Sequence, residues 1–176
     1  DYEMWIGPAP MVPYTAGRCQ PPGTYWNYDY SIGYLGGWGA HPLDLMIWGS
    51  DADLGGPVTV EGTGEITSGA LYDTVFNWNM TIDLGGVEMT FTPGSDSTKF
   101  IGTEGWVRVW RGGCDAEPKS LLEKEIPLEK RVLPTTGNHM GDFIRGVLSR
   151  GDSAANIEHA VRSDVISHLC DIAVRL

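Results

Sequence analysis

The middle of the chain alternates hydrophobic and polar residues in two consecutive runs, separated by Gly85 and Gly86. The hydrophobic positions are Phe76, Trp78, Met80, Ile82 and Leu84 in the first run and Val87, Met89 and Phe91 in the second. Two runs of period 2 joined by a two-glycine loop predict a β-hairpin with one apolar face. We expect further strands at 58–66, 99–101 and 106–110, and a weaker, charged edge strand at 126–132.

Hydrophobic residues at helical spacing flank this β region. The pattern predicts a helix over 35–48, ended by Gly49, and two helices at 138–149 and 157–176. The last two carry apolar stripes, formed by Met140, Ile144, Val147 and Leu148 and by Ile157, Val161, Val165, Leu169, Ile172 and Leu176. The order of elements predicts an α+β fold, in which helices cover one face of a predominantly antiparallel sheet. The other face is left to solvent or to a partner.

Residues 1–27 are rich in proline, and we expect them to form an extended arm rather than a helix or a central strand. The aromatic residues Trp5, Tyr14, Tyr25 and Trp26 would pin this arm. Residues 28–176 fit a single domain, since a chain of 176 residues is the length of one ordinary domain. The chain begins at Asp1 with no visible targeting signal and reads as a piece of a longer protein.

The formal net charge of −11 argues against nucleic acid and against an anionic membrane surface as partners. No apolar run reaches the roughly 20 residues that a membrane-spanning helix needs. Cys19, Cys114 and Cys170 lie far apart and form no C-x-x-C pair, so reduced thiols are expected. Reduced thiols favour the cytoplasm slightly, although the compartment stays open without the true N-terminus.

The strongest candidate for chemistry is His41, at the start of the predicted helix beside glycines and Trp38. Such an imidazole can bond a substrate or carry a proton. It can also be a buried histidine bonded to backbone. Asp44 lies three residues later on the same side of the helix. It either orients His41 as a supporting carboxylate or simply complements the helix dipole.

Other candidates are weaker. Arg18, Asp29 and Tyr30 have the composition of a sugar-binding surface, but they also suit a role in pinning the arm. His139 either lines a cleft or only enters a helix capped by Asn138, and the two remaining histidines are expected to be packing or surface residues. No nucleotide, phosphate, zinc or serine-hydrolase motif is present, so we expect no metal site.

Several segments occur in a characteristic order along the whole chain. They are Trp5–Pro10, Arg18-Cys19, Asp29–Ser31, Trp38–Asp44, Gly102–Trp106, Asn138-His139 and His168–Leu176. Together they resemble the C-terminal domain of the Gfo/Idh/MocA oxidoreductases, named for glucose–fructose oxidoreductase, inositol dehydrogenase and rhizopine catabolism, and especially its bacterial dehydrogenase branch.

The resemblance implies a two-domain enzyme whose Rossmann domain, absent from this chain, binds NAD or NADP. No cofactor is then expected in this chain, which should be inactive alone. The domain would have a large open sheet, whose face forms a homo-oligomer. Hydride transfer would act on a sugar, a cyclitol or a derivative. His41 would be catalytic, Arg18, Asp29, Tyr30, Trp38 and His139 would bind the substrate, and Asp44 would support them.

The chain departs from the family pattern at one position that bears on catalysis. Many relatives carry an aspartate four residues before the histidine, where this chain has Gly37. Asp29 or Asp44 replaces it, or the chemistry differs, or the domain only binds. Two alternatives to the enzyme therefore stay open: a carbohydrate-binding module without redox chemistry, and a domain for sheet-mediated assembly.

Overall fold

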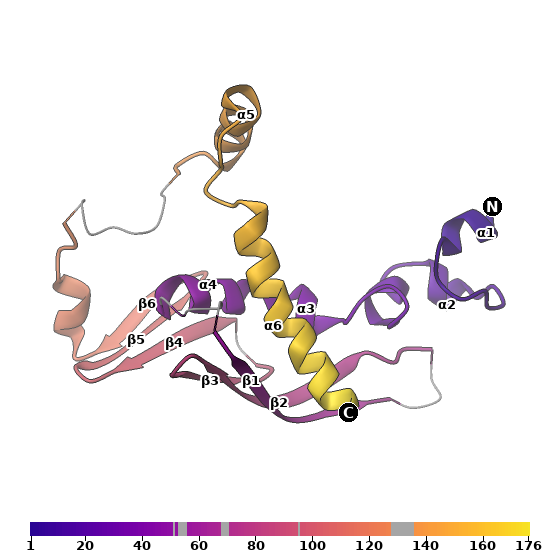
Figure 1. Cartoon of the computed structure of the whole chain (residues 1–176), viewed down its shortest axis with the longest axis horizontal. Helices are drawn as coiled ribbons and strands as arrows, with labels where there is room; N and C mark the ends of the chain where they lie inside the picture. Colours follow the sequence, from indigo (N-terminus) through magenta and orange to yellow (C-terminus); the bar gives the residue numbers. More distant parts are fainter. Residues whose placement is uncertain (51, 53–55, 68–70, 95, 128–135) are drawn as a thin grey trace.

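The computed structural model describes residues 1–50, 52, 56–67, 71–94, 96–127 and 136–176. The helices of the N-terminal half are α1 (Tyr2–Ile6), α2 (Ala16–Cys19), the 3₁₀ helix η1 (Gly23–Trp26), α3 (Tyr34–Gly37) and α4 (Ala40–Ser50). The strands are β1 (Val58–Ile66), β2 (Val75–Leu84), β3 (Val87–Phe91), β4 (Ser97–Gly102), β5 (Gly105–Trp110) and β6 (Gly113–Glu117). The 3₁₀ helix η2 (Lys119–Glu123), α5 (His139–Ser149) and α6 (Ile157–Arg175) follow (Figure 1).

The predicted hairpin is confirmed as β2 and β3, which pair antiparallel with Leu84 opposite Val87. β1 pairs with the other edge of β2. The buried positions of β2 are Val75, Trp78, Met80, Ile82 and Leu84. Phe76, which the alternation places on the apolar face, is exposed instead. The register between β1 and β2 shifts at Glu65 and Ile66, and Val75 takes the buried position at that end of the strand.

A second sheet contains β4, β5 and β6, all antiparallel. The α+β class is thus confirmed, with the described strands divided between two three-stranded sheets and not joined in one large sheet. The pattern missed β6, because its sequence GCDAE has no hydrophobic alternation. The expected edge strand at 126–132 lies mostly outside the described residues, and Ile126 and Pro127 are not in a strand.

The predicted helix over 35–48 is two helices, α3 and α4, separated by Trp38 and Gly39. Leu35, Leu43 and Met46 from these helices are buried in the core with the apolar face of β2. At the break, the Gly39 N–H bonds to the Tyr34 carbonyl five residues back, and an added Cβ at Gly39 would overlap the Leu35 carbonyl oxygen, so only glycine fits there. α4 therefore starts afresh at Ala40 and places His41 in its first turn.

The predicted C-terminal helices are confirmed, but the apolar stripe of α6 does not face the core of this domain. Its buried residues are Ser163, Ile166, Ser167, Cys170 and Asp171, and these face β1, α3 and α4. Most of its apolar stripe is exposed, namely Ile157, Val161, Val165, Ile172 and Leu176. Small and polar side chains let α6 approach α3 and α4 closely, so the stripe points away from the core of this domain.

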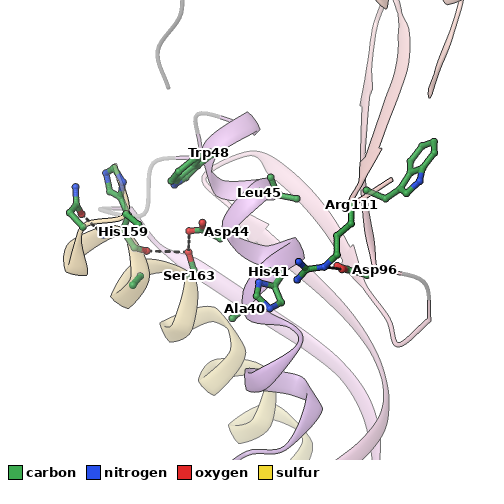
Figure 2. Close-up of a pocket in the computed structure, with 13 residues that line it drawn as sticks. Ala40, His41, Asp44, Leu45, Trp48, Asp96, Arg111, His159 and Ser163 are labelled. Atoms are coloured by element: carbon green, nitrogen blue, oxygen red, sulfur yellow. Dashed lines mark hydrogen bonds and ion pairs between the residues drawn. The ribbon is translucent and has the colours of Figure 1, made fainter. Parts of the chain in front are cut away.

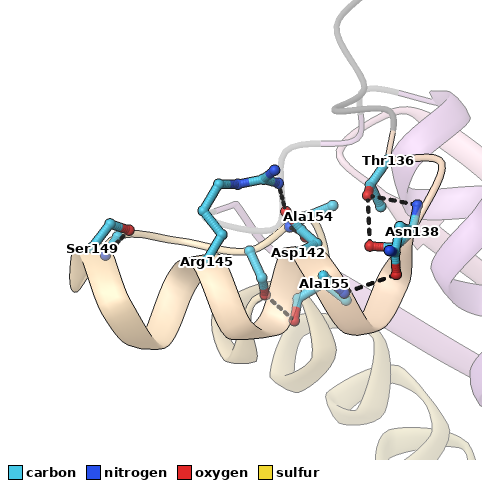
Figure 3. A network of polar contacts seen from close by, with 10 residues as sticks. Thr136, Asn138, Asp142, Arg145, Ser149, Ala154 and Ala155 are labelled. Carbon is cyan, nitrogen blue, oxygen red and sulfur yellow. Dashed lines mark hydrogen bonds and ion pairs between the residues drawn. The ribbon is translucent and has the colours of Figure 1, made fainter.

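α5 stands at the end of α6 that lies away from the sheets (Figure 1). Asn138 caps it, because its side-chain oxygen accepts a hydrogen bond from the Gly141 N–H at 2.8 Å. The buried Asp142 carboxylate accepts the Ala154 N–H at 2.7 Å and pairs with Arg145 (Figure 3). These bonds, the Ala154 N–H first, lower the pKa of Asp142. The network fixes α5 to the segment that leads into α6.

Residues 1–27 are not simply extended, as the prolines suggested, because they contain α1, α2 and η1. The first two helices occupy proline-free gaps, and each has a side-chain cap. Asp1 accepts the Met4 N–H, and Thr15 accepts the Arg18 N–H. None of the helices in the described part of the chain is long and apolar enough to cross a membrane.

Candidate active site

A cavity of about 510 Å³ lies where the first turns of α4 and α6 meet the turn between β5 and β6 (Figure 2). Four segments far apart in the sequence therefore build it: α4, Asp96 before β4, the end of β5 with the turn after it, and the start of α6. Its polar side chains include His41 and Asp44 from α4, His159 and Ser163 from α6, Asp96 directly before β4 and Arg111 directly after β5. Cavities of this size with a few convergent polar groups are typical of small-molecule sites.

His41 is exposed at this cavity, and its ring lies 5.6 Å from the Trp38 ring in an edge-on contact. Its backbone N–H bonds to the Trp38 carbonyl at 3.2 Å, which fixes the start of α4. The imidazole itself has no hydrogen bond to any residue that the structure describes. The interpretation of His41 as a buried, backbone-bonded histidine is therefore wrong. Both ring nitrogens remain available to a ligand.

Asp44 lines the cavity but bonds to α6, because its Oδ1 accepts a hydrogen bond from the Ser163 hydroxyl at 2.6 Å. Such a short bond to a carboxylate is charge-assisted. The bond joins the two helices that form the cavity wall. Within the described residues it holds the Asp44 carboxylate to Ser163 and not to His41, so any support of His41 by Asp44 would be indirect.

Arg111 lies in the turn between β5 and β6 and pairs with Asp96 at 2.8 Å. Its guanidinium also lies over the Trp38 ring, 5.6 Å from the centroid. The rim thus combines donors and acceptors of opposite charge around a flat ring, which suits a neutral ligand with several hydroxyl groups. Groups of three or more potential metal ligands are absent from the described residues.

The other predicted site residues do not line this cavity. Arg18 pairs with Asp29 at 3.4 Å, and the Tyr30 ring packs on Trp5 at 5.4 Å. These contacts tie the N-terminal helices to the segment before α3, which is the pinning role considered as an alternative. His139 lies exposed on α5, away from the two sheets. Whether these residues contact a substrate stays a prediction.

Comparison with known proteins identifies the family. A family model described as the C-terminal alpha/beta domain of the Gfo/Idh/MocA oxidoreductase family matches residues 1–176. The chain belongs to this family. A search of curated proteins finds no match.

A similar solved structure is a candidate oxidoreductase from Erwinia carotovora atroseptica SCRI1043, with a TM-score of 0.55 and 14% sequence identity. The alignment covers 92% of this chain and 52% of that protein, so this Gfo/Idh/MocA domain spans about half the length of its structural relative.

The structure also shows what surrounds Gly37, the position at which the family resemblance leads us to expect an aspartate. A Cβ added at Gly37 would overlap the Tyr25 hydroxyl and lie 2.6 Å from a carbon of the Tyr25 ring. Tyr25 thus fills the space that a longer side chain needs. Burial raises the pKa of Tyr25, and the neighbouring Tyr34 adds to the shift. Tyr25 is therefore a neutral phenol at neutral pH and does not supply the missing negative charge.

Sequence reasoning missed Asp96, Arg111 and Ser163 and assigned His159 to packing or the surface. His159 does pack edge-on against Trp48, at 6.1 Å between ring centroids, but it also lines the cavity. His159 and Ser163 are four residues apart on α6, a spacing that places them on one face. This spacing could have indicated that the two residues share a site, but the sequence does not show that their face of α6 packs against α4.

Proposed function

We propose that this chain is the C-terminal, substrate-binding half of an NAD(P)-dependent oxidoreductase that acts on a hydroxyl or carbonyl carbon of a carbohydrate-like substrate. Membership of the Gfo/Idh/MocA family supports the oxidoreductase class. The observation that carries the assignment of the site is His41, an exposed imidazole that lines the cavity and has no hydrogen bond within the described part of the chain. His41 would take a proton from the reacting hydroxyl during oxidation and return it to the carbonyl during reduction.

The other residues of the cavity would bind and orient the ligand. The carboxylates of Asp44 and Asp96 accept hydrogen bonds from hydroxyl groups, and the guanidinium of Arg111 donates them. Trp38 does not line this cavity, but it contacts the His41 ring at its edge and would offer a flat surface for the C–H groups of a sugar ring. These side chains do not fit the dinucleotide, since the chain has no glycine-rich phosphate loop and the cavity contains two carboxylates. We therefore propose that NAD(P) binds to a separate domain, which would supply the hydride acceptor and donor.

Exposed apolar side chains on α5 and α6 support a second domain. On α5 these are Met140, Phe143, Ile144, Val147 and Leu148, and on α6 they are Ile157, Val161, Val165, Ile172 and Leu176. Neighbouring helices that expose so much apolar surface normally pack against another body. A dinucleotide-binding domain on this surface would lie beside the start of α6, which also forms one wall of the His41 cavity.

The test joins this chain to the dinucleotide-binding domain of its natural protein and follows the reduction of NAD⁺ or NADP⁺ with a panel of sugars and polyols. His41→Ala should lower kcat by about 10²–10⁴-fold, the usual contribution of general acid–base catalysis. His168→Ala is the matched control, because His168 is also exposed on a helix but pairs with Asp164 outside the cavity. A His41→Ala rate within about threefold of the unmodified enzyme would refute the catalytic role.

A further inference from the structure

A second cavity of about 510 Å³ adjoins the first, and its walls are mainly aromatic. We name it the aromatic cleft. Its rings come from three elements: Tyr34 and Trp38 from α3 and its end, Phe76 and Trp78 from β2, and Phe91 from β3.

The rings of the aromatic cleft differ in exposure. Trp78 and Phe91 are each 7% exposed and pack on one another at 5.3 Å between centroids. Tyr34, Trp38 and Phe76 are 42%, 47% and 47% exposed. The hydrophobic pattern of β2 places Phe76 in the core, yet it lies half-exposed in the cleft. Large aromatic side chains gathered on one concave surface favour ligand binding over a purely structural role.

Polar groups limit the chemistry of the occupant. Asp96 and Thr92 line the same cleft. The indole N–H of Trp78 is buried and has no hydrogen-bond partner among the residues that the structure describes, so a ligand oxygen that reaches it would satisfy a group that is otherwise costly to bury. A saccharide ring has apolar C–H faces for the aromatic rings and hydroxyl groups for the polar ones. A purely apolar ligand would satisfy none of these polar groups.

The aromatic cleft adjoins the His41 cavity. Asp96 lines both cavities. Trp38 lines the cleft and also contacts the His41 ring and the Arg111 guanidinium. A ligand whose reacting ring lies at His41 can therefore extend past Trp38 into the cleft.

We infer that the aromatic cleft is a second saccharide subsite, so that the substrate is a glycoside of at least two sugar rings. The reacting ring lies at His41, and the second ring lies against Phe76 and Trp78. This inference rests on the proposed function, because it takes the His41 cavity as the site of the reacting ring.

The experiment measures the binding of matched ligand pairs to this chain by NMR. Each pair is a methyl glycoside and the disaccharide of the same sugar, in gluco, galacto and manno configurations. The indole N–H signals of Trp38 and Trp78 report occupancy and are assigned with Trp→Phe variants. For at least one pair, we expect the disaccharide to bind about tenfold more tightly and to shift both signals, while the methyl glycoside shifts mainly the Trp38 signal.

Phe76→Ala should weaken disaccharide binding about 3- to 10-fold and leave methyl glycoside binding unchanged. Phe76→Leu keeps much of the apolar volume and should therefore not disturb the fold. It should weaken disaccharide binding to a similar extent, because it also removes the aromatic ring. Phe143→Ala is the control, because Phe143 is 59% exposed on α5 and does not line the cleft. His41→Ala should weaken both members of the pair.

Three results would overturn the inference. Equal affinity for both members of every pair would refute the second subsite. If the methyl glycoside still binds and its binding depends on His41, the proposed function is not refuted by that result. If an aryl glycoside binds more tightly than any disaccharide, the occupant of the aromatic cleft is a flat aglycone and not a second sugar. Unchanged Trp38 and Trp78 signals with every ligand would refute the subsite and the saccharide substrate together.

Discussion

The hydrogen bond between Ser163 and Asp44 should contribute measurably to stability, because it joins α6 to α4. The Ser163 hydroxyl is 2.6 Å from the Asp44 carboxylate and 3.1 Å from the His159 carbonyl, and its one proton favours the shorter, charged partner. Ser163 is only 3% exposed, so water cannot readily replace it. A hydrogen bond to a charged group contributes about 1.5–3 kcal/mol to the free energy of unfolding.

Two effects reduce the loss expected for Ser163→Ala. Asp44 lines an open cavity, where water can take over part of the bond, so the lower part of that range applies. Alanine also favours a helix over serine by about 0.5 kcal/mol. We therefore expect a net loss of about 1–1.5 kcal/mol, which corresponds to a decrease in Tm of about 2–6 °C for a chain of this length.

Urea unfolding followed by circular dichroism measures this loss, and Ser167→Ala provides the control. Ser167 is also buried, one turn later on α6, but among the described residues its hydroxyl bonds within its own helix, to Asp164. We expect Ser167→Ala to change the free energy of unfolding by less than about 0.5 kcal/mol. A double-mutant cycle with Asp44→Ala should give a coupling energy of about 1 kcal/mol. Equal effects of the two serine variants, or no coupling, would refute the reasoning.

Three further predictions concern other parts of the chain. Burial raises the pKa of the Cys170 thiol to about 12, so a thiol reagent at neutral pH should label the exposed Cys114 quickly and Cys170 only after unfolding, as peptide mass spectrometry can check. The lowered pKa of Asp142 means that the ionised carboxylate stabilises the segment after α5 at neutral pH, and that this stabilisation is lost as the pH falls through the lowered pKa. An NMR titration should show the change at the Ala154 N–H, and Asp142→Asn should abolish it. Gly37→Ala should lower stability by about 1–3 kcal/mol through overpacking, and by much less in a Tyr25→Ala background, as thermal unfolding would show.

The sequence predicts elements better than it predicts contacts between them. The β2–β3 hairpin and the start of α5 follow from local signals, namely period-2 alternation with two glycines and an Asn138 cap. β6 lacks such a signal, and its place depends on pairing with β5. The alternation predicts that Phe76 is buried, but Phe76 is exposed, because the register between β1 and β2 shifts beside it.

The candidate site shows the same limit. His41 and Trp38 are close in sequence, and the glycines and aromatic residues around them indicate a special local geometry by themselves. Arg111 and Ser163 reach the cavity from elements 70 or more positions away in the chain, and neither belongs to a recognisable motif. Local patterns therefore located one wall of the cavity, whereas the other walls depend on how α6 and the second sheet pack on α4.

The orientation of α6 links these observations to the proposed two-domain enzyme. Burial of an apolar stripe normally stabilises a helix against its own core, yet here Ser163, Ser167 and Asp171 take the inward face. Each of these polar side chains bonds to a carbonyl or a charged side chain, which makes their burial tolerable. An apolar stripe left outside would then be costly unless another body covers it. If a dinucleotide-binding domain covers it, α6 is shared by two cores, and Ser163 fixes the cavity wall from within that shared helix.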